Sequence, residues 1–437
     1  MPAGGVILPD RSQARARFAL LAVAVAGELL LRGPVRGLGD SQDLAVHLGG
    51  ARAWLQGGDP YDSLQLAAAF RAGGGPEALT PTGAWMPSVY PSTTYALEAP
   101  LALLGWRAAV VALQAGSLLL VVVALIRLAR AARLPPERAG PFVLAGLALA
   151  PLHTGFAMGQ IAVPAAALLV LGWSERRARP ALSGVLMALG VALKPSLALP
   201  VMVAALARPC RRWAWPAAAV LVGLVAVGEL RLALAGHLGL SSWLRNVAIA
   251  AGPGGMNSAA PANPARLTIL GWEVLLQQLP AGARPYAGAV CLALAAPLLW
   301  AAFRRLRAAG DAEAQLYPLS LLCLVALLAT YHRTYDAVLL WFPLAALARD
   351  WTVLGRPVRL LVALVYAGFL VPGPVALDLL ARAGRVPAAV ATSAAWRLLV
   401  LPYQTWLLTA AAAGLAWALA RPGVASAAGV AGDLAGR

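Results

Sequence analysis

The sequence predicts an all-α protein that crosses a membrane many times. Of its 437 residues, 60% are hydrophobic and only 12% are charged, and the mean hydropathy is +0.74. A soluble domain would have about a quarter of its residues charged. Gly, Pro and Arg clusters interrupt the apolar runs, as in a series of spans of roughly 20 residues. The runs lack the alternation of barrel strands, so we expect a bundle of about twelve transmembrane helices and no strands.

The charge distribution predicts the orientation of the chain. There are 35 Lys and Arg residues against 18 Asp and Glu residues, which gives a formal net charge of +17. The basic residues lie in short clusters between apolar runs, and this pattern is typical of cytoplasmic loops. We therefore expect a multi-pass protein of the plasma (inner) membrane with both termini in the cytoplasm. We expect the lipid bilayer as a partner and no nucleic acid.

The first segments follow from this orientation. Residues 1–17 are predicted to be a cytoplasmic arm, and the apolar run that follows lacks a clear cleavage site, so we expect a retained helix at about Arg17–Leu31. An outer loop is predicted at 32–92, with a helix at Leu44–Leu55 lying along the membrane surface. The apolar run Thr93–Leu104 is too short to cross and is predicted to be re-entrant or interfacial.

Further apolar runs predict the remaining spans of one transmembrane domain that covers residues 18–420. They are Ala108–Ile126, Pro141–Leu152, Ile161–Trp173, Ala181–Leu193, Leu197–Ala207, Trp215–Leu234, Ala287–Phe303, Leu316–Thr330, Ala337–Leu347, Leu360–Val371 and Leu398–Ala420. A second outer loop is predicted at 235–286, with an amphipathic segment at Leu267–Leu279. Residues 421–437 are predicted to be a cytoplasmic tail.

This topology brings most of the conspicuous polar groups to the outer face. They are Asp40, Asp43, His47, Asp59, Tyr61, Asp62, Tyr90, Thr94, Tyr95, Glu98, His153, Gln160, Lys194, Asn257, Ser258, Arg266 and the turn from Tyr331 to Asp336. Ionisable groups at helix ends in a membrane are costly unless they serve a function. Carboxylates from one loop beside cations from others predict an acid–base and anion-binding pocket. The three cysteines have no metal-binding or disulfide spacing, and no metal is expected.

Lys194 differs from all the other basic residues of the chain. It is the only lysine among the 35, and it stands before Pro195 at a break between two apolar runs. A compact cation with three donors suits a phosphate oxygen. The alternative is a lysine that anchors a helix end at the membrane surface.

Several short blocks of residues follow one another in a fixed order along the chain. The first loop carries Asp43, the step Val46-His47, the run Gly50-Ala51-Arg52-Ala53-Trp54-Leu55 and the run Gly57-Gly58-Asp59-Pro60-Tyr61. Later blocks are Tyr90-Pro91 with Pro100-Leu101, Gly159-Gln160, Leu193-Lys194-Pro195, the loop from Asn257-Ser258 to Arg266, and Tyr331-His332 to Asp336. Together they extend from residue 40 to about residue 350, and their order resembles that of glycosyltransferase family 87. His47 and the turn at residues 331–336 depart from the residues that are common in the family.

The resemblance implies a fold and a reaction. The fold would be a GT-C type bundle with surface helices on the outer loops. The reaction would resemble that of polyprenyl-phosphate-mannose-dependent α-1,2-mannosyltransferases, with a glycolipid or glycan acceptor. The lipid-phosphate sugar would be a substrate, so neither a cofactor, a nucleotide sugar nor an obligatory metal is expected.

Such a transfer predicts roles for individual residues. Direct displacement at an anomeric carbon needs a base within about 3 Å of the acceptor hydroxyl. We assign this role to Asp43, with Asp40 as the runner-up; the alternative for Asp43 is a helix N-cap. The leaving phosphate needs positive charge where its negative charge develops. The candidates for that charge are Lys194, His332, Arg333 and Arg266.

The remaining polar residues are predicted to contact the acceptor or the sugar. They are Asp40, His47, Tyr90, Glu98, Asn257, Tyr335 and Asp336. Some have alternative roles: His332 as an interfacial side chain, Arg266 and Arg333 as outer-leaflet anchors, and Asp336 as a partner of His332 or as an N-cap. The run Asp59-Pro60-Tyr61 is predicted to be a structural turn.

Two other functions compete with the transferase. A transporter or lipid-linked-sugar flippase would place charged residues deep within its spans to line a pathway. Only Glu28 and Glu229 come close to this, and both lie near the ends of their segments. A receptor-like or assembly subunit with a decayed site is the third possibility, and the retained polar cluster argues against it.

Overall fold

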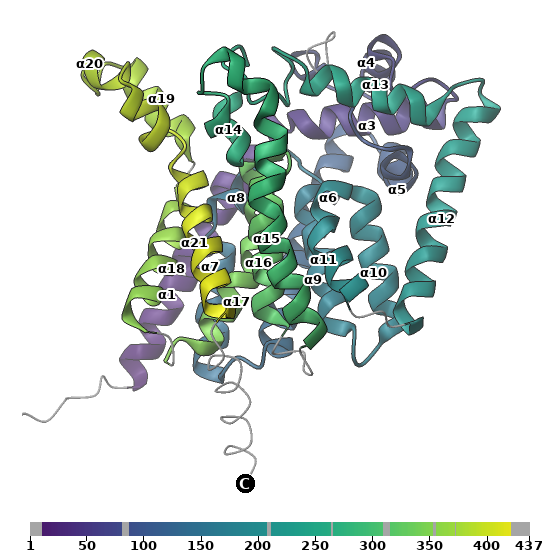
Figure 1. The fold of residues 1–437 in the computed structure, drawn as a ribbon. Coiled ribbons are helices and arrows are strands. Elements are labelled where there is room, and N and C mark those ends of the chain that lie inside the picture. The colour runs from purple at the N-terminus through teal and green to yellow at the C-terminus, as the bar shows by residue number, and fades with distance from the viewer. Residues whose placement is uncertain are drawn as a thin grey trace, which may run out of the picture.

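The computed structural model describes residues 11–80, 87–207, 211–263, 265–308, 315–352, 355–371 and 373–420. Over these residues the chain is almost entirely helical, which confirms the all-α class. Long helices run side by side in a bundle, while α3 (Gln42–Leu55), α4 (Ser63–Ala72) and α13 (Gly239–Ala251) lie across one of its ends (Figure 1). We call this end the covered end. Helix α1 begins and α21 ends at the opposite end of the bundle.

The bundle is built around an apolar centre. Its helices are α1 (Arg11–Leu30), α6 (Trp106–Ala131), α7 (Pro136–Leu147), α8 (Ala150–Ala157), α9 (Ala162–Glu175), α10 (Pro180–Leu193), α11 (Pro195–Ala207), α12 (Arg211–Leu234), α15 (Ala287–Ala308), α16 (Leu316–Ala329), α17 (Trp341–Asp350), α18 (Arg356–Gly368) and α21 (Tyr403–Ala420). Helix α16 is apolar on every side, and such a helix belongs in the interior. Its neighbours bury nearly all of its residues.

The remaining elements are short and lie mainly at the covered end or between spans. They are η1 (Leu31–Val35), α2 (Arg36–Asp40), η2 (Glu77–Leu79), α5 (Ser92–Ala102), η3 (Arg266–Thr268), β1 (Ile269–Leu270), α14 (Trp272–Leu276), η4 (Ala281–Tyr286), β2 (His332–Arg333), η5 (Thr334–Leu340), α19 (Pro374–Arg382), α20 (Ala388–Ala391) and η6 (Trp396–Val400).

The predicted count of about twelve crossings is not confirmed. Among the described residues, four segments are long and apolar enough to cross a membrane: Ser12–Asp40, Trp106–Ala131, Arg212–Leu234 and Arg284–Ala308. The pair α7 and α8, bent by 45°, would be a fifth. Helices α9, α10 and α16 have 14 residues each. That length gives about 21 Å, which is less than the roughly 30 Å of a hydrocarbon core.

The start of the first outer loop differs from the prediction. The helix of α1 continues through η1 and α2 to Asp40, so the first residues assigned to the loop are helical. Pro34 lies within the π-helical turn η1, where the wider helix accommodates a residue that has no N–H to donate. The helix predicted at Leu44–Leu55 is present as α3. It lies across the covered end, where α4 and α5 pack against it and nearly all of its residues are buried.

The second outer loop also folds differently. In place of the predicted segment Leu267–Leu279, the chain forms η3, β1 and α14. Gly271 separates the last two with φ = 124°, a conformation that favours glycine and interrupts any continuous helix. Strand β1 pairs antiparallel with β2, with Leu270 opposite His332. The strand pair, which the sequence did not predict, joins the second outer loop to the turn at residues 331–336.

Helix α13 was not predicted and holds the first outer loop in place. Its Asn246 side chain donates to the carbonyl groups of Tyr61 and Ser88, at 3.0 and 3.1 Å. Trp243 donates to the carbonyl of Val89 at 2.8 Å. Hydrogen bonds between segments of both outer loops therefore stabilise the covered end.

Candidate active site

Asp43 lies at the covered end, in the first turn of α3. It is not the N-cap, because Ser41 occupies that position. The Asp43 carboxylate instead accepts a hydrogen bond of 2.8 Å from the Gln160 side chain. The start of a helix favours a negative charge. The residue is largely buried and keeps 9% of its surface exposed.

Gln160 connects Asp43 with two tyrosines. Its Nε2 atom lies 2.9 Å from the Tyr335 hydroxyl and 3.2 Å from the Tyr90 hydroxyl. Sequence reasoning gave Gln160 no role of its own. The only signal was its place in the Gly159-Gln160 block of the resemblance, because the partners come from three distant segments.

The turn that carries Gln160 packs directly on α3. Gly159 has φ = +65°, and an added Cβ would lie 2.7 Å from the Cβ of Leu44. Both facts favour glycine at this position. The backbone N–H of Asp43 donates to the carbonyl of Met158 at 3.1 Å. Helix α3 and this turn therefore form one unit around the Asp43 carboxylate.

Lys194 supplies a cation from the break between α10 and α11. The residue before a proline avoids the helical region, and Lys194 is extended with φ = −145° and ψ = 88°. Its Nζ atom donates to Oδ1 of Asp336 at 2.7 Å and lies 4.6 Å from the centre of the Tyr335 ring. Lys194 therefore faces the interior of the site, and its side chain is 12% exposed.

Asp336 is the buried centre of the cation cluster. Its Oδ2 atom lies 3.1 Å from Nδ1 of His332 and accepts the backbone N–H of Arg333, also at 3.1 Å. Asp336 is the third residue of η5 and accepts the backbone N–H of the N-cap residue Arg333, so it stabilises that helix without being its N-cap. Burial would raise the pKa of Asp336, but Lys194 and His332 lower it to about 2. The carboxyl group is therefore ionised at neutral pH.

Arg333 carries a second positive charge into the site. Its guanidinium donates to Oγ1 of Thr268 at 3.2 Å, to the carbonyl of Met256 at 2.7 Å and to the hydroxyl of Tyr331. Burial opposes the charge, yet Tyr331, Tyr335 and Asp43 raise the pKa of Arg333 above its ordinary value. Within the described part of the chain, no carboxylate forms an ion pair with it, so its charge is available to a ligand.

His47 lies one turn after Asp43 on α3 and contacts Glu98 of α5. Nδ1 of His47 is 2.6 Å from Oε1 of Glu98, and both side chains are buried. Nε2 of His47 is 3.0 Å from the carbonyl oxygen of Gly159. The Tyr90 ring meets the imidazole edge-on, with 5.3 Å between the ring centres.

Three predicted site residues stand apart from this cluster. Asp40 forms an exposed ion pair of 2.8 Å with Arg36. The Arg266 guanidinium donates to the carbonyl of Pro261 within its own loop. Asn257 is half-buried, and its backbone N–H donates to Ala250. Over the described ranges, no hydrogen bond joins any of the three to Asp43, Lys194 or Asp336.

The acidic residues that a transport pathway would use have local partners instead. Glu28 pairs with Arg32 at 2.6 Å on the same helix. Glu229 accepts from the Ser92 hydroxyl at 2.6 Å and from the backbone N–H of Leu240 at 3.1 Å. Neither contact favours a charged pathway through the bundle.

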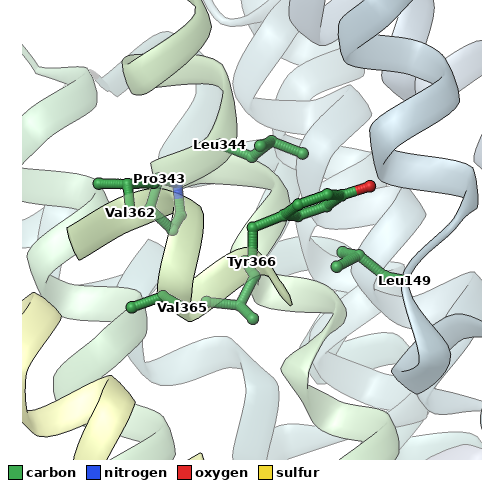
Figure 2. A pocket seen from close by; sticks show the side chains of 7 residues that line it. Leu149, Pro343, Leu344, Val362, Val365 and Tyr366 are labelled. Carbon is green, nitrogen blue, oxygen red and sulfur yellow. The ribbon is translucent and has the colours of Figure 1, made fainter. Parts of the chain in front are cut away.

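A separate hollow lies among η5, α17, α18 and the start of α8 (Figure 2). It is lined by Leu149, Leu340, Pro343, Leu344, Val362, Val365 and Tyr366. The Tyr366 hydroxyl donates to the carbonyl of Ala145 at 3.1 Å, so its polar atom already has a partner. The hollow is apolar and supplies no acid, base or anion-binding group. In the part of the chain that the structure describes, no group of His, Cys, Asp and Glu is arranged to hold a metal ion.

The cluster at the covered end combines two chemical capacities. The Asp43 carboxylate can take a proton, and Lys194 and Arg333 can hold an anion. Gln160 and Tyr335 connect the two parts.

A sequence model of glycosyltransferase family 87 matches residues 89–330, more than half of the chain. No curated protein and no solved structure is significantly similar to this chain. The match includes Gln160 and Lys194, while Asp43 and Asp336 lie outside it.

Proposed function

Because the chain belongs to glycosyltransferase family 87, we propose that this membrane glycosyltransferase moves a hexose from a polyprenyl-phosphate donor to a glycolipid or glycan. Mannose is our first candidate for the hexose. The transfer would take place at the covered end of the bundle, which we propose to be extracytoplasmic.

The connection between Asp43 and Lys194 is the observation that carries the proposal. Gln160 donates to Asp43 at 2.8 Å and lies 2.9 Å from the Tyr335 hydroxyl. The ring of Tyr335 lies 4.6 Å from the Lys194 ammonium. These contacts support a single site in which Asp43 accepts a proton and Lys194 helps to stabilise an anion, as a displacement at a phosphorylated sugar requires.

The proposed reaction is a single displacement. The Asp43 carboxylate takes the proton of the acceptor hydroxyl, and the acceptor oxygen forms a bond to the anomeric carbon. The bond from that carbon to the phosphate oxygen breaks, and the polyprenyl phosphate leaves with the electron pair. The configuration at the anomeric carbon is inverted. The phosphate is a stable anion, so its departure needs positive charge and no general acid.

The charges suggest different roles for the two cations. Asp336 already balances Lys194 at 2.7 Å, and this pair leaves little net charge for a ligand. Arg333 forms no such pair within the described ranges, and its fork of donors suits a phosphate group. We propose that Arg333 supplies most of the charge that stabilises the leaving phosphate, while Lys194 contributes an N–H donor beside it.

The direct test is a transfer assay with the purified protein in liposomes. Radiolabelled polyprenyl-phosphate-mannose is incubated with a panel of membrane glycolipids, and products are identified by mass. We expect one hexose to be added to an acceptor and one polyprenyl phosphate to be released. Transfer only from a nucleotide sugar would contradict the proposed donor, and movement of the lipid-linked sugar across the bilayer without transfer would favour a flippase.

Replacing Arg333 by methionine tests the source of the stabilising charge. We expect kcat to fall by about 10²-fold, the effect of removing one donor aimed at a developing charge. Arg245→Met is the matched control, because Arg245 lies on α13 and its guanidinium donates to Ser242 within the same helix. Steady-state assays with varied donor concentration measure both variants. Equal activity of the two variants would contradict the role of Arg333.

A further inference from the structure

We infer that His47 and Glu98 form a buried charged pair that positions the Asp43 carboxylate by fixing the Gly159–Gln160 turn. This inference deepens the proposed transferase and rests on it. The sequence predicted His47 and Glu98 as contacts to the acceptor or the sugar. The structure gives them a different environment.

Neither side chain has a surface that a sugar can reach. His47 is 0% exposed and Glu98 is 2% exposed. Glu98 reaches the imidazole from α5, and the Tyr90 ring covers it from the loop before α5. A group that contacts a bound sugar must be open to it, so this pair acts through other residues.

Two polar contacts of His47, a hydrogen bond through Nε2 and an ion-pair contact through Nδ1, determine its protonation. The carbonyl oxygen of Gly159 has no hydrogen to donate, so the contact with Nε2 requires a proton on Nε2. A neutral imidazole has only one N–H, and its bare Nδ1 would then face the Glu98 carboxylate at 2.6 Å. Only the imidazolium gives both acceptors a proton. Burial would lower the pKa of His47, but Glu98, the Gly159 carbonyl and Asp43 raise it above its ordinary value.

The contact with Gly159 connects the pair to Asp43. Three hydrogen bonds join α3 to residues 158–160: the Asp43 N–H to the Met158 carbonyl, His47 to the Gly159 carbonyl, and the Gln160 amide to the Asp43 carboxylate. The middle bond fixes the peptide group immediately before Gln160. Without it, the Gln160 side chain and the carboxylate that it holds are free to shift. A misplacement of about 1 Å can cost about 10²-fold in rate.

The test uses His47→Leu, His47→Gln and Glu98→Gln in the full-length enzyme. We expect His47→Leu to lower kcat about 100-fold while KM for donor and acceptor changes less than about threefold. A glutamine side chain can still donate to the Gly159 carbonyl, so His47→Gln should recover at least about tenfold of that loss. A rise in the acceptor KM at unchanged kcat would instead show contact with substrate and overturn the inference.

The pH profile separates positioning from a purely structural role. The titratable groups beside His47 are Glu98 on α5, Asp43 on α3 and Tyr90 on the loop before α5. As the pH rises through the elevated pKa of His47, the remaining proton moves to the Glu98 side, the bond to Gly159 is lost, and kcat should fall. In Glu98→Gln, the amide can donate to Nδ1 of a neutral imidazole that keeps its Nε2 proton. We therefore expect near-normal kcat at neutral pH without that alkaline decline.

His153→Gln is the matched control. His153 is also buried and also contacts a backbone carbonyl through Nε2, that of Leu147 at 2.8 Å. It should retain the wild-type rate and pH profile. A Glu98→Gln enzyme with the same alkaline decline as the wild type would overturn the inference.

A measurement without substrate separates this inference from the proposed function. The ¹⁵N resonances of the His47 side chain should report protons on both nitrogens at neutral pH in the wild type and on one nitrogen in Glu98→Gln. A neutral His47 in the wild type would overturn the charged pair even if sugar is transferred. If the wild type transfers no sugar from any polyprenyl-phosphate donor, the proposed function fails instead, whatever the spectrum shows.

Discussion

Replacing Asp43 by asparagine is expected to lower kcat for sugar transfer by about 10³-fold. General base catalysis contributes roughly 10² to 10⁴ in rate, and an amide cannot accept the proton of the acceptor hydroxyl. The asparagine carbonyl can still accept the hydrogen bond from Gln160, which is 2.8 Å long in the wild type. The geometry of the site should therefore survive while its proton acceptor is lost.

Asp62→Asn is the matched control for this substitution. Asp62 lies in the same outer loop, and its carboxylate is the N-cap of α4, where it accepts the N–H groups of Leu64 and Gln65. Asparagine is as good an N-cap as aspartate, so this variant should keep its fold and its activity. Transfer from labelled polyprenyl-phosphate-mannose in liposomes measures both. Wild-type activity in Asp43→Asn would remove Asp43 as the base, and equal losses in both variants would indicate a loop effect.

The donor KM gives a second readout for Asp43→Asn. A base that acts only as the acceptor is deprotonated should change kcat without changing donor binding. We therefore expect the donor KM to stay within about threefold of the wild type. A large rise in the donor KM at unchanged kcat would place Asp43 against the donor sugar instead of the acceptor hydroxyl.

The sequence predicted where most helices lie, but it predicted the residues at which they begin and end less accurately. Continuous apolar runs identified most of the bundle helices, from α6 to α21, because burial and lipid exposure both select apolar side chains. It did not show that α1 extends to Asp40, since Pro34 and the polar residues after it are typical of a loop. It also missed α13, whose sequence alone does not indicate that it packs on the first outer loop.

The candidate site was only partly predictable for a related reason. The residue types and the resemblance marked Asp43 and Lys194, because a carboxylate and a lone lysine are unusual in an apolar chain. Gln160 was passed over, because its role exists only through contacts with Asp43 and Tyr335, which are more than 100 residues away from it. The burial of His47 could not be predicted either, since it depends on how α5 packs on α3.

The surroundings of Arg333 depend on contacts between two distant loops, which the sequence of neither loop alone can show. Its guanidinium is held by Thr268 and Met256, and it reaches them because β2 pairs with β1. The strands have two residues each, too few to produce a periodic signal in the sequence. Register between distant loops is a property of the folded chain, so the two arginines predicted as equal candidates, Arg266 and Arg333, came to have different surroundings.

Replacing Lys194 by methionine is expected to destabilise the protein and abolish most of its activity. The substitution leaves Asp336, which is 1% exposed, with a buried charge that has lost its closest cation at 2.7 Å. Removing one partner of a buried ion pair costs about 3 to 5 kcal/mol. The N–H donor beside the proposed donor phosphate is lost as well, so transfer should fall by about 10²-fold or more.

The pH dependence of stability checks this explanation. The pKa of Asp336 is lowered to about 2, below the value of about 3.9 for an unfolded chain. Its pairing therefore stabilises the folded state above pH 4 or so and is lost as the pH falls towards 2. The difference in melting temperature between the wild type and Lys194→Met should be largest near neutral pH and should shrink as the solution is acidified.

The double variant Lys194→Met with Asp336→Asn separates stability from catalysis. Removing the orphaned carboxylate takes away the buried charge, so most of the lost stability should return, while transfer stays low because the N–H donor of Lys194 is still missing. Tryptophan fluorescence during heating and the liposome transfer assay measure the two properties on the same samples. If the double variant recovered both its thermal stability and its transfer rate, Lys194 would be a structural partner of Asp336 with no part in the transfer. If Lys194→Met alone kept its transfer rate, the phosphate-binding role of Lys194 would be wrong.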